Sequence, residues 1–235
     1  MVLLLIPAAT GRTHARWNPV SAAMLFVYAI GFSYAYRQLT AGTGALLLFG
    51  AVQLTILTGA IAGGERPPIA EWLGLVLAVG GLVYFVLPGL HAPPFLGSAL
   101  MVAAGIAWGI YTLRGRGATN PIGETAHNFT LAALPAIAVS VLAHLGANIS
   151  NKGAVLAVCS GVITSGIGYV IWYAALPGLT AARAALVQLA VPLITAAAGV
   201  ALLGETLTPR LLFAGLLILG GIALAISARK RAQRT

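Results

Sequence analysis

Residues 183–221, RAALVQLAVPLITAAAGVALLGETLTPRLLFAGLLILGG, decide the fold of this chain. The stretch contains two long apolar runs, separated by the short polar segment 204–210. A helix needs about 20 apolar residues to cross the hydrocarbon core of a bilayer. Both runs approach that length, since the second continues to residue 228. Thr208 precedes Pro209, which places a capping side chain before a proline at the first helical position. The stretch therefore predicts two transmembrane helices joined by a tight turn.

The rest of the chain has the same character. Of its 235 residues, 60% are hydrophobic and 7% are charged, whereas soluble domains carry about 25% charged residues. No strand-like alternation of polarity is visible, which argues against a transmembrane barrel. We predict an all-α integral membrane protein with about eight transmembrane helices, at 19–36, 43–64, 70–89, 95–113, 127–145, 154–176, 183–203 and 211–228.

The residue types that are missing exclude several functions. The chain has no aspartate and a single cysteine, Cys159, so Asp-dependent proteases and pumps, disulfides and Cys-type zinc sites are excluded. A lipid-modifying enzyme would need histidines and acids clustered at the interface, and here they are scattered. No nucleotide-binding motif is present. We therefore expect no enzyme, no catalytic residue, no metal site and no cofactor.

The basic residues predict the orientation in the membrane. The net charge is +9, but only the tail from Arg229 to Arg234 is clustered, and it directly follows a span. With both termini cytoplasmic, the inner loops hold 10 of the 13 basic residues. We therefore expect a multi-pass protein of a bacterial-type inner membrane, with the lipid bilayer and a small-molecule substrate as partners. Nucleic acid is excluded as a partner, and a homodimer is left open.

An internal repeat appears when the chain is shifted by 140 residues. Leu39-Thr40-Ala41 then falls on Leu179-Thr180-Ala181, Gly64-Glu65 on Gly204-Glu205, and Gly80-Gly81 on Gly220-Gly221. Five predicted spans, an odd number, separate the two Gly-Glu pairs, so these pairs face opposite sides of the membrane. Inverted repeats of this kind are an architecture of secondary transporters, whose substrate sites lie between the halves near the midplane.

These residues resemble the EamA-type repeat of the drug/metabolite transporter superfamily. The resemblance rests on Pro192, Gly204-Glu205, Gly215 and Gly220-Gly221 in the second copy, and on Gly64, Glu65, Arg66, Gly74 and Gly80 in the first, where Val52 replaces the proline. Trp108 and Tyr111 resemble the aromatic signature of the helix that opens the second repeat. The resemblance implies a ten-helix fold and a secondary transporter, with export as the favoured direction, of a small organic metabolite such as an amino acid.

Compared with that ten-helix fold, the first repeat is incomplete. Residues 1–89 would form an incomplete first repeat without its first helix and most of its second, residues 95–228 a complete second repeat, and residues 229–235 a basic tail. The ten apolar residues at the start would span about 15 Å as a helix, half of a bilayer core. We expect codons upstream of Met1 to encode about 50–60 further residues. The alternative is a truncated, transport-inactive membrane protein of the same family.

Polar and aromatic residues inside the spans are the candidates for a substrate path. Gln53 and Gln188 lie deep in apolar runs, where an amide must find a partner, either a substrate or another helix. The aromatic residues could stack on a substrate or form an interfacial belt, and a proline inside a span permits a bend. The predicted path residues are Gln53, Trp108, Tyr111, Ser165, Trp172, Gln188 and Pro192.

The two Gly-Glu pairs are predicted to be structural. Gly64-Glu65 and Gly204-Glu205 follow apolar runs, so each acid lies in a turn rather than deep in a span. Glutamates in such turns can accept hydrogen bonds from the first turn of the next helix, with support from the helix dipole. We expect both acids to anchor a hairpin rather than to couple transport to protons.

Overall fold

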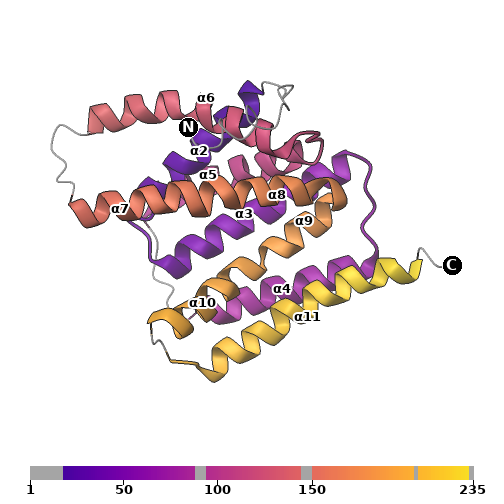
Figure 1. Ribbon diagram of the computed structural model, residues 1–235. Helices are drawn as coiled ribbons and strands as arrows, with labels where there is room; N and C mark the ends of the chain where they lie inside the picture. Colours follow the sequence, from indigo (N-terminus) through magenta and orange to yellow (C-terminus); the bar gives the residue numbers. More distant parts are fainter. Residues whose placement is uncertain (1–17, 88–93, 144–149, 204–205, 233–235) are drawn as a thin grey trace. The chain divides into compact units, whose positions relative to one another are not determined.

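The computed structural model describes residues 18–87, 94–143, 150–203 and 206–232. These residues are largely helical and contain no strand, which confirms the all-α class. Residues 1–17, Gly204, Glu205, Arg234 and three of the four histidines lie outside them, and so do the predictions made for these residues. The helices are α2 (Pro19–Ala35), α3 (Ala41–Ala62), α4 (Ile69–Val86), α5 (Phe95–Gly115), α6 (Pro121–Ala143), α7 (Asn151–Cys159), α8 (Gly168–Ala175), α9 (Ala181–Gln188), α10 (Ala190–Leu203) and α11 (Pro209–Ala232) (Figure 1).

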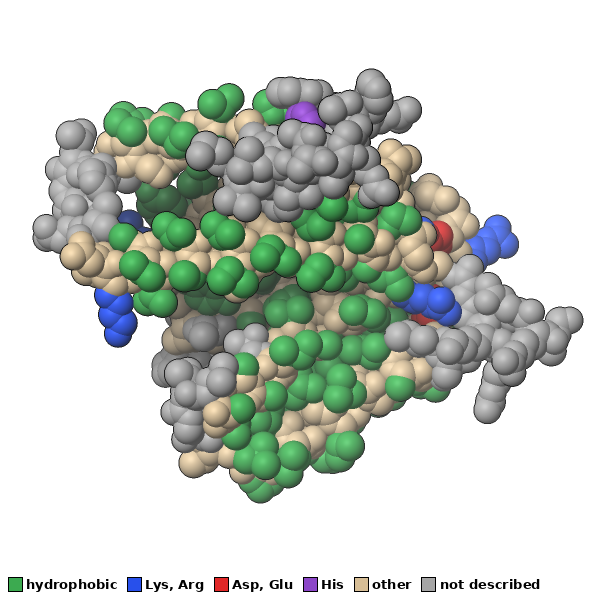
Figure 2. Space-filling view, viewed as in Figure 1, with side chains coloured by type: hydrophobic (Ala, Val, Ile, Leu, Met, Phe, Trp, Pro, Cys, Tyr) green, Lys and Arg blue, Asp and Glu red, His purple; other side chains and the backbone are tan. Residues whose placement is uncertain are grey.

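Each predicted span coincides with one helix or with one interrupted helix. Within the part of the chain that the structure describes, four helical stretches are long and apolar enough to cross a membrane: Gly42–Ala62, Phe95–Gly115, Pro121–Leu142 and Asn151–Gly178. Shorter apolar helices include Pro19–Ala35 and Ile69–Phe85. Large apolar side chains are exposed along both the long and the short helices, as Figure 2 shows for α7, α8 and α11. A lipid environment accounts for this exposure, because water would oppose it.

Helix α6 begins earlier than the sequence predicted. It starts at Pro121 rather than at residue 127. The Asn120 side chain accepts a hydrogen bond from the Gly123 N–H at 3.0 Å, and Glu124 Oε1 accepts one from the Thr119 N–H at 3.0 Å. Asn120 and Pro121 thus repeat the device at Asn18-Pro19, where Asn18 caps α2. The prediction was wrong here because capping starts a helix ahead of its apolar run.

Two predicted spans are interrupted. Between α7 and α8, residues Ser160–Ile167 form a π-helix. The predicted span 183–203 divides at Leu189, between α9 and α10. There the Leu189 N–H donates to Leu186 O at 3.0 Å instead of continuing the α-helical ladder to Ala185 O. Pro192 follows within one turn and has no N–H to donate to Gln188 O.

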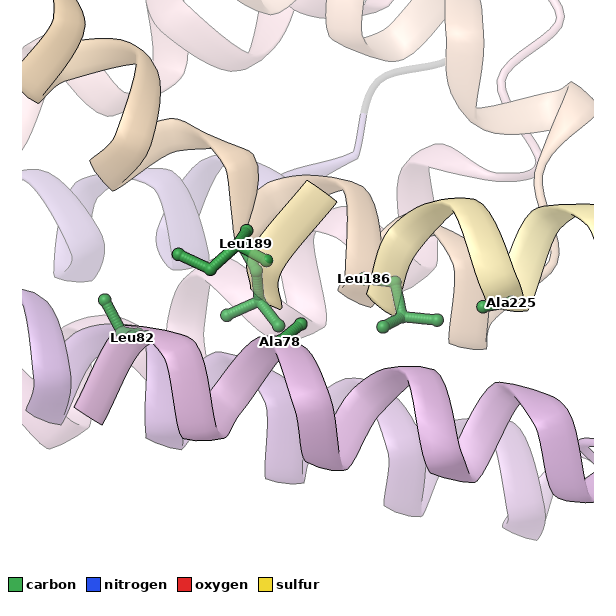
Figure 3. Packing of buried hydrophobic residues seen from close by; sticks show 6 residues of the cluster. Ala78, Leu82, Leu186, Leu189 and Ala225 are labelled. Carbon is green, nitrogen blue, oxygen red and sulfur yellow. The ribbon is translucent and has the colours of Figure 1, made fainter. Parts of the chain in front are cut away.

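The described chain forms two compact units. The first contains residues up to Ile30 together with Ile110–Leu179, and the second contains Gly31–Gly109 together with the chain from Thr180 onward. In the second unit, α4, α9 and α11 share a hydrophobic core, part of which Figure 3 shows. Its buried members are Ala78, Leu82, Leu186, Leu189, Ile218 and Ala225.

Within the second unit, equivalent positions of the 140-residue repeat have equivalent structure. Helices α3 and α9 begin 140 residues apart, and so do α4 and α11. Thr40 caps α3 by accepting from the Thr43 N–H, and Thr180 caps α9 by accepting from the Arg183 N–H, both at 3.3 Å. The repeated Leu-Thr-Ala motif is therefore a helix-start signal in both copies.

The contact between α4 and α11 follows the same repeat. A Cβ on Gly74 would collide with Gly221 O, and a Cβ on Gly81 would lie 3.1 Å from Ala214 O. Shifting by 140 residues converts the first pair of positions into the second. The two helices therefore run antiparallel, side by side as in Figure 1. This is the contact pattern that an inverted repeat would give, although the extents of the two repeats stay a prediction.

Candidate functional site

Gln53 compensates for the interruption between α9 and α10. Its side chain, on α3, is 4% exposed, and its Nε2 donates to Ala185 O at 2.6 Å. In a continuous helix that carbonyl would accept from Leu189, whose N–H is directed to Leu186 O instead. The amide of Gln53 therefore supplies the donor that the broken helix lacks, as the apolar surroundings require.

Gln188 and Trp108 form the second polar contact at this place. Trp108 Nε1, on α5, donates to Gln188 Oε1, and Gln188 Nε2 donates to Ala184 O at 3.1 Å. Gln188 is 5% exposed, and both polar atoms of its amide are bonded. We call Gln53, Trp108 and Gln188 the glutamine cluster. It joins α3 and α5 to the end of α9.

Two glycines let α5 approach α3 closely enough for these contacts. A Cβ on Gly105 would lie 2.6 Å from Leu48 O, and one on Gly109 would lie 2.7 Å from the Thr55 side chain. Both distances are shorter than a real side chain allows. The small residues at 105 and 109 therefore permit the helix packing that carries Trp108 to Gln188.

Replacing Trp108 with phenylalanine tests the cluster directly. The change keeps an apolar ring but removes the donor to the buried Gln188 Oε1. We expect a destabilisation of about 1–3 kcal/mol, because a buried acceptor is left without its partner. Thermal unfolding of the purified protein measures this change. Trp72→Phe is the control, because Trp72 is 40% exposed, and an equal effect of both substitutions would contradict the prediction.

Glu65 caps the first turn of α9. Glu65 lies after Gly64, whose φ of +84° suits glycine at the end of α3. Its carboxylate accepts from the Ala181 N–H at 3.2 and 3.3 Å. The sequence pointed to the next helix, α4, as the partner, whereas these two bonds join Glu65 to α9. Pro67 and Pro68 provide no N–H groups at the start of α4, whereas the first turn of α9 offers unpaired ones.

Sequence reasoning overlooked the neighbouring pair of Glu71 and Arg183. Glu71, in the first turn of α4, is 3% exposed, and its Oε1 lies 3.7 Å from Arg183 Nε. An acid in a first turn is an ordinary helix-start signal. Nothing in the sequence indicates that this one is buried beside an arginine more than a hundred residues away.

Aromatic residues gather in the first unit. Tyr111 is fully buried, and its ring centroid lies 4.7 Å from that of Tyr173 and 6.3 Å from that of Tyr169. The Tyr173 hydroxyl donates to Tyr111 O at 3.4 Å. Trp108 and Tyr111 both lie on α5, but Trp108 belongs to the second unit and Tyr111 to the first.

The first unit also buries polar atoms that the sequence did not single out. Thr125 and Asn128 lie one turn apart on α6 and are almost fully buried, as is Thr112 on α5. The Oγ1 atoms of both threonines and the Asn128 Oδ1 have no hydrogen-bond partner among the described residues. The predicted path residues Ser165, in the π-helix, and Trp172, on α8, are half-buried in this unit.

Other features of the described chain offer less chemistry. An open apolar groove of about 410 Å³ runs along α3 and α5, past Gly50, Leu54 and Ile106. The hydroxyls of Thr55 and Thr58 in it donate to carbonyls of their own helix. Among the described residues, no three His, Cys, Asp or Glu side chains gather as metal ligands.

Comparison with known proteins supplies the family. The EamA-like transporter family model matches residues 95–227. An uncharacterised protein of Pseudomonas aeruginosa is 52% identical over 92% of this chain and 76% of its own length. An uncharacterised transporter of Archaeoglobus fulgidus is 27% identical over 86% of this chain and 74% of its own. A probable terminal-alkyne amino-acid exporter of Streptantibioticus cattleyicolor is 25% identical over 93% of this chain and 76% of its own.

A solved crystal structure shares the fold. It aligns with a TM-score of 0.82 over 98% of this chain and 84% of that chain, at 20% sequence identity. The helical architecture, the apolar exposed helix faces and the family match over more than half of the sequence agree. The chain is therefore a multi-pass membrane protein that belongs to the EamA-like transporter family.

Proposed function

We propose that the protein is a secondary transporter that exports a small organic metabolite, with amino acids as the favoured class. The family supports transport, and a relative named as an amino-acid exporter supports both the direction and the substrate class. A transporter of this kind needs no catalytic residue. Substrate recognition and a change between two open states are sufficient.

The observation that carries the proposal is the glutamine cluster at an interrupted helix. Polar side chains inside a membrane protein are costly, and they commonly mark the path of a substrate. Interrupted helices are typical of transporter binding sites, because their free backbone groups can contact a polar solute. Here Gln53 and Gln188 are buried in an apolar core and meet the α9–α10 interruption. We propose this place as part of the substrate path.

We also propose that both termini are cytoplasmic. The distribution of basic residues supports this orientation. In this orientation, the following contacts within each unit would join helix ends on the cytoplasmic side. In the first unit, Arg114 Nη2 donates to Asn18 Oδ1 at 2.9 Å, and Arg116 Nε donates to Leu179 O at 3.2 Å. In the second unit, Glu65 accepts from Ala181.

Flux measurements test the proposed function. Purified protein in liposomes is loaded with radiolabelled amino acids, and efflux is followed with and without an imposed pH gradient. We expect saturable efflux of at least one amino acid, and lower efflux for Gln53→Leu and Gln188→Leu at equal amounts of folded protein. Absence of saturable flux above that of empty liposomes would overturn the proposal and favour a transport-inactive member. Loss of folded protein in both variants would favour a purely structural cluster.

A further inference from the structure

The interruption between α9 and α10 leaves hydrogen-bond acceptors at the end of α9. Ala185 O has lost its helical donor and is served by Gln53. The carbonyl of Gln188 lacks the usual donor four residues later, because that residue is Pro192. The end of a helix also carries a partial negative charge of about half an electron, from its aligned carbonyl groups. This place therefore favours a positive charge.

Gln53 adds a further acceptor at the same place. Its Nε2 is bound to Ala185 O, so its Oε1 lies beside the end of α9, and this oxygen is buried without a hydrogen-bond partner among the described residues. The side-chain N–H groups around it are engaged: Trp108 donates to Gln188 Oε1, and Gln188 donates to Ala184 O. The cluster thus has an unsatisfied acceptor and an excess of oxygen over N–H, which a ligand with its own donors would balance.

We propose that this cluster binds a primary ammonium group, and that the group belongs to the transported solute. Ala185 and Gln188 are three residues apart, about 4.5 Å along the helix axis. The Gln53 amide and the Gln188 carbonyl therefore lie at the same end of α9, and the proposed ammonium group would bind there to the Gln53 Oε1 and the Gln188 carbonyl. An ammonium group donates three hydrogen bonds, which matches a site of few neutral oxygens. Hard metal ions such as Ca²⁺ and Mg²⁺ need about six oxygen ligands, more than these residues supply.

The position within α9 and α10 suits a solute that must enter and leave. The residues of α9 are almost all buried, including Ala185 and Gln188. On α10, Val191 and Ile194 are exposed and Pro192 is half-buried. The ammonium site therefore lies where a fixed, buried half-helix meets a less buried one. Because a proline ends the regular ladder there, α10 can change direction without breaking hydrogen bonds of α9.

A ligand series on the purified protein in lipid nanodiscs tests the ammonium site. The unfolding midpoint is measured with increasing n-propylammonium, tetramethylammonium, sodium and potassium chlorides at constant ionic strength. A ligand that binds only the folded state raises the midpoint in a saturable way. We expect such a rise with n-propylammonium alone, because tetramethylammonium has the charge without N–H donors. Equal rises with tetramethylammonium, a rise with sodium or potassium instead, or no rise at all would overturn the proposal.

Two variants locate the site. Pro192→Ala restores an N–H for the Gln188 carbonyl and leaves Gln53 untouched, so we expect about tenfold weaker n-propylammonium binding, the effect of losing one hydrogen bond to a charged group. Pro135→Ala, inside α6, is the matched control and should bind as the native protein does. Gln53→Leu should abolish the response. If Gln53→Leu does not fold, Pro192→Ala decides alone, and unchanged affinity in that variant would overturn the site.

This inference rests on the proposed function only for the source of the ammonium group. The binding series needs no transport. Ammonium-specific binding without flux of any amine-bearing solute would therefore contradict the transporter and leave the site intact. Saturable transport without ammonium-specific binding would overturn the site and leave the transporter intact.

Discussion

Replacing Gly221 with valine is expected to destabilise the protein severely, whereas the same change at Gly220 is expected to have little effect. A Cβ at position 221 would collide with Gly74 O and would lie 3.0 Å from Ala78 N, both backbone atoms of α4. Backbone atoms cannot turn aside as a flexible side chain can. Overpacking of a core typically costs about 1–3 kcal/mol, and we expect at least the upper end here.

Gly220 provides the matched control. It lies on the same helix, next in sequence, and a Cβ there would have no atom within 4 Å. The small gain of helix propensity from glycine to valine is common to both variants, so their difference isolates the contact of α4 with α11. Thermal unfolding in detergent or nanodiscs measures it. Equal midpoints for Gly221→Val and Gly220→Val would show that α4 and α11 do not touch at position 221.

Replacing Glu71 with leucine is expected to cost about 3 kcal/mol. The carboxylate is 3% exposed and lies 3.7 Å from Arg183 Nε. Removing one member of a buried ion pair leaves the other charge uncompensated, which commonly costs about 3–5 kcal/mol. We expect the lower end because the Arg183 side chain keeps 19% of its surface exposed. The free energy of unfolding, from denaturant or thermal titration, measures the loss.

Two further variants separate the ion pair from a general effect of removing an acid. Glu124→Leu removes an acid from the first turn of α6, where it caps the helix, and should cost only about 1 kcal/mol. The double variant Glu71→Leu with Arg183→Leu should recover most of the stability, because no unpaired charge is left. A double variant as unstable as Glu71→Leu alone would contradict the role of the pair.

The spans could be predicted from sequence because each depends only on local properties. Apolar length predicted the eight helical segments, and Thr208 before Pro209 predicted the cap of α11, where the Leu211 N–H donates to Thr208 Oγ1 at 3.2 Å. A similar signal, Asn120 before Pro121, was present at the start of α6. It was overlooked because the residues that follow it are less hydrophobic than the rest of the helix. Apolar length and capping residues were thus sufficient to predict most of the helix boundaries.

The interactions of the site could not be predicted in the same way. The sequence shows that Gln53 is an amide in an apolar run and must find a partner, but its partner is the carbonyl of Ala185, 132 residues away. That contact depends on how α3 packs against α9 and on the interruption at Leu189. Pro192 indicated a bend, but the interruption lies at Leu189, and leucine is not a helix-breaking residue. The contact of Glu65 with Ala181 was not predicted for the same reason, since it also comes from a distant helix.

The contact between α4 and α11 has the two-fold form of a contact between the protomers of a dimer. The contact of Gly74 with Gly221 and the contact of Gly81 with Ala214 are equivalent under the 140-residue repeat. Each helix therefore presents the same surface to the other, as the protomers of an isologous dimer do. In a true homodimer, both copies of such a patch must carry the same residues. Here the copies are covalently joined and free to differ, as Gly74 and Ala214 already do. The sequences of α4 and α11 can therefore diverge while the contact between the two helices keeps its two-fold arrangement.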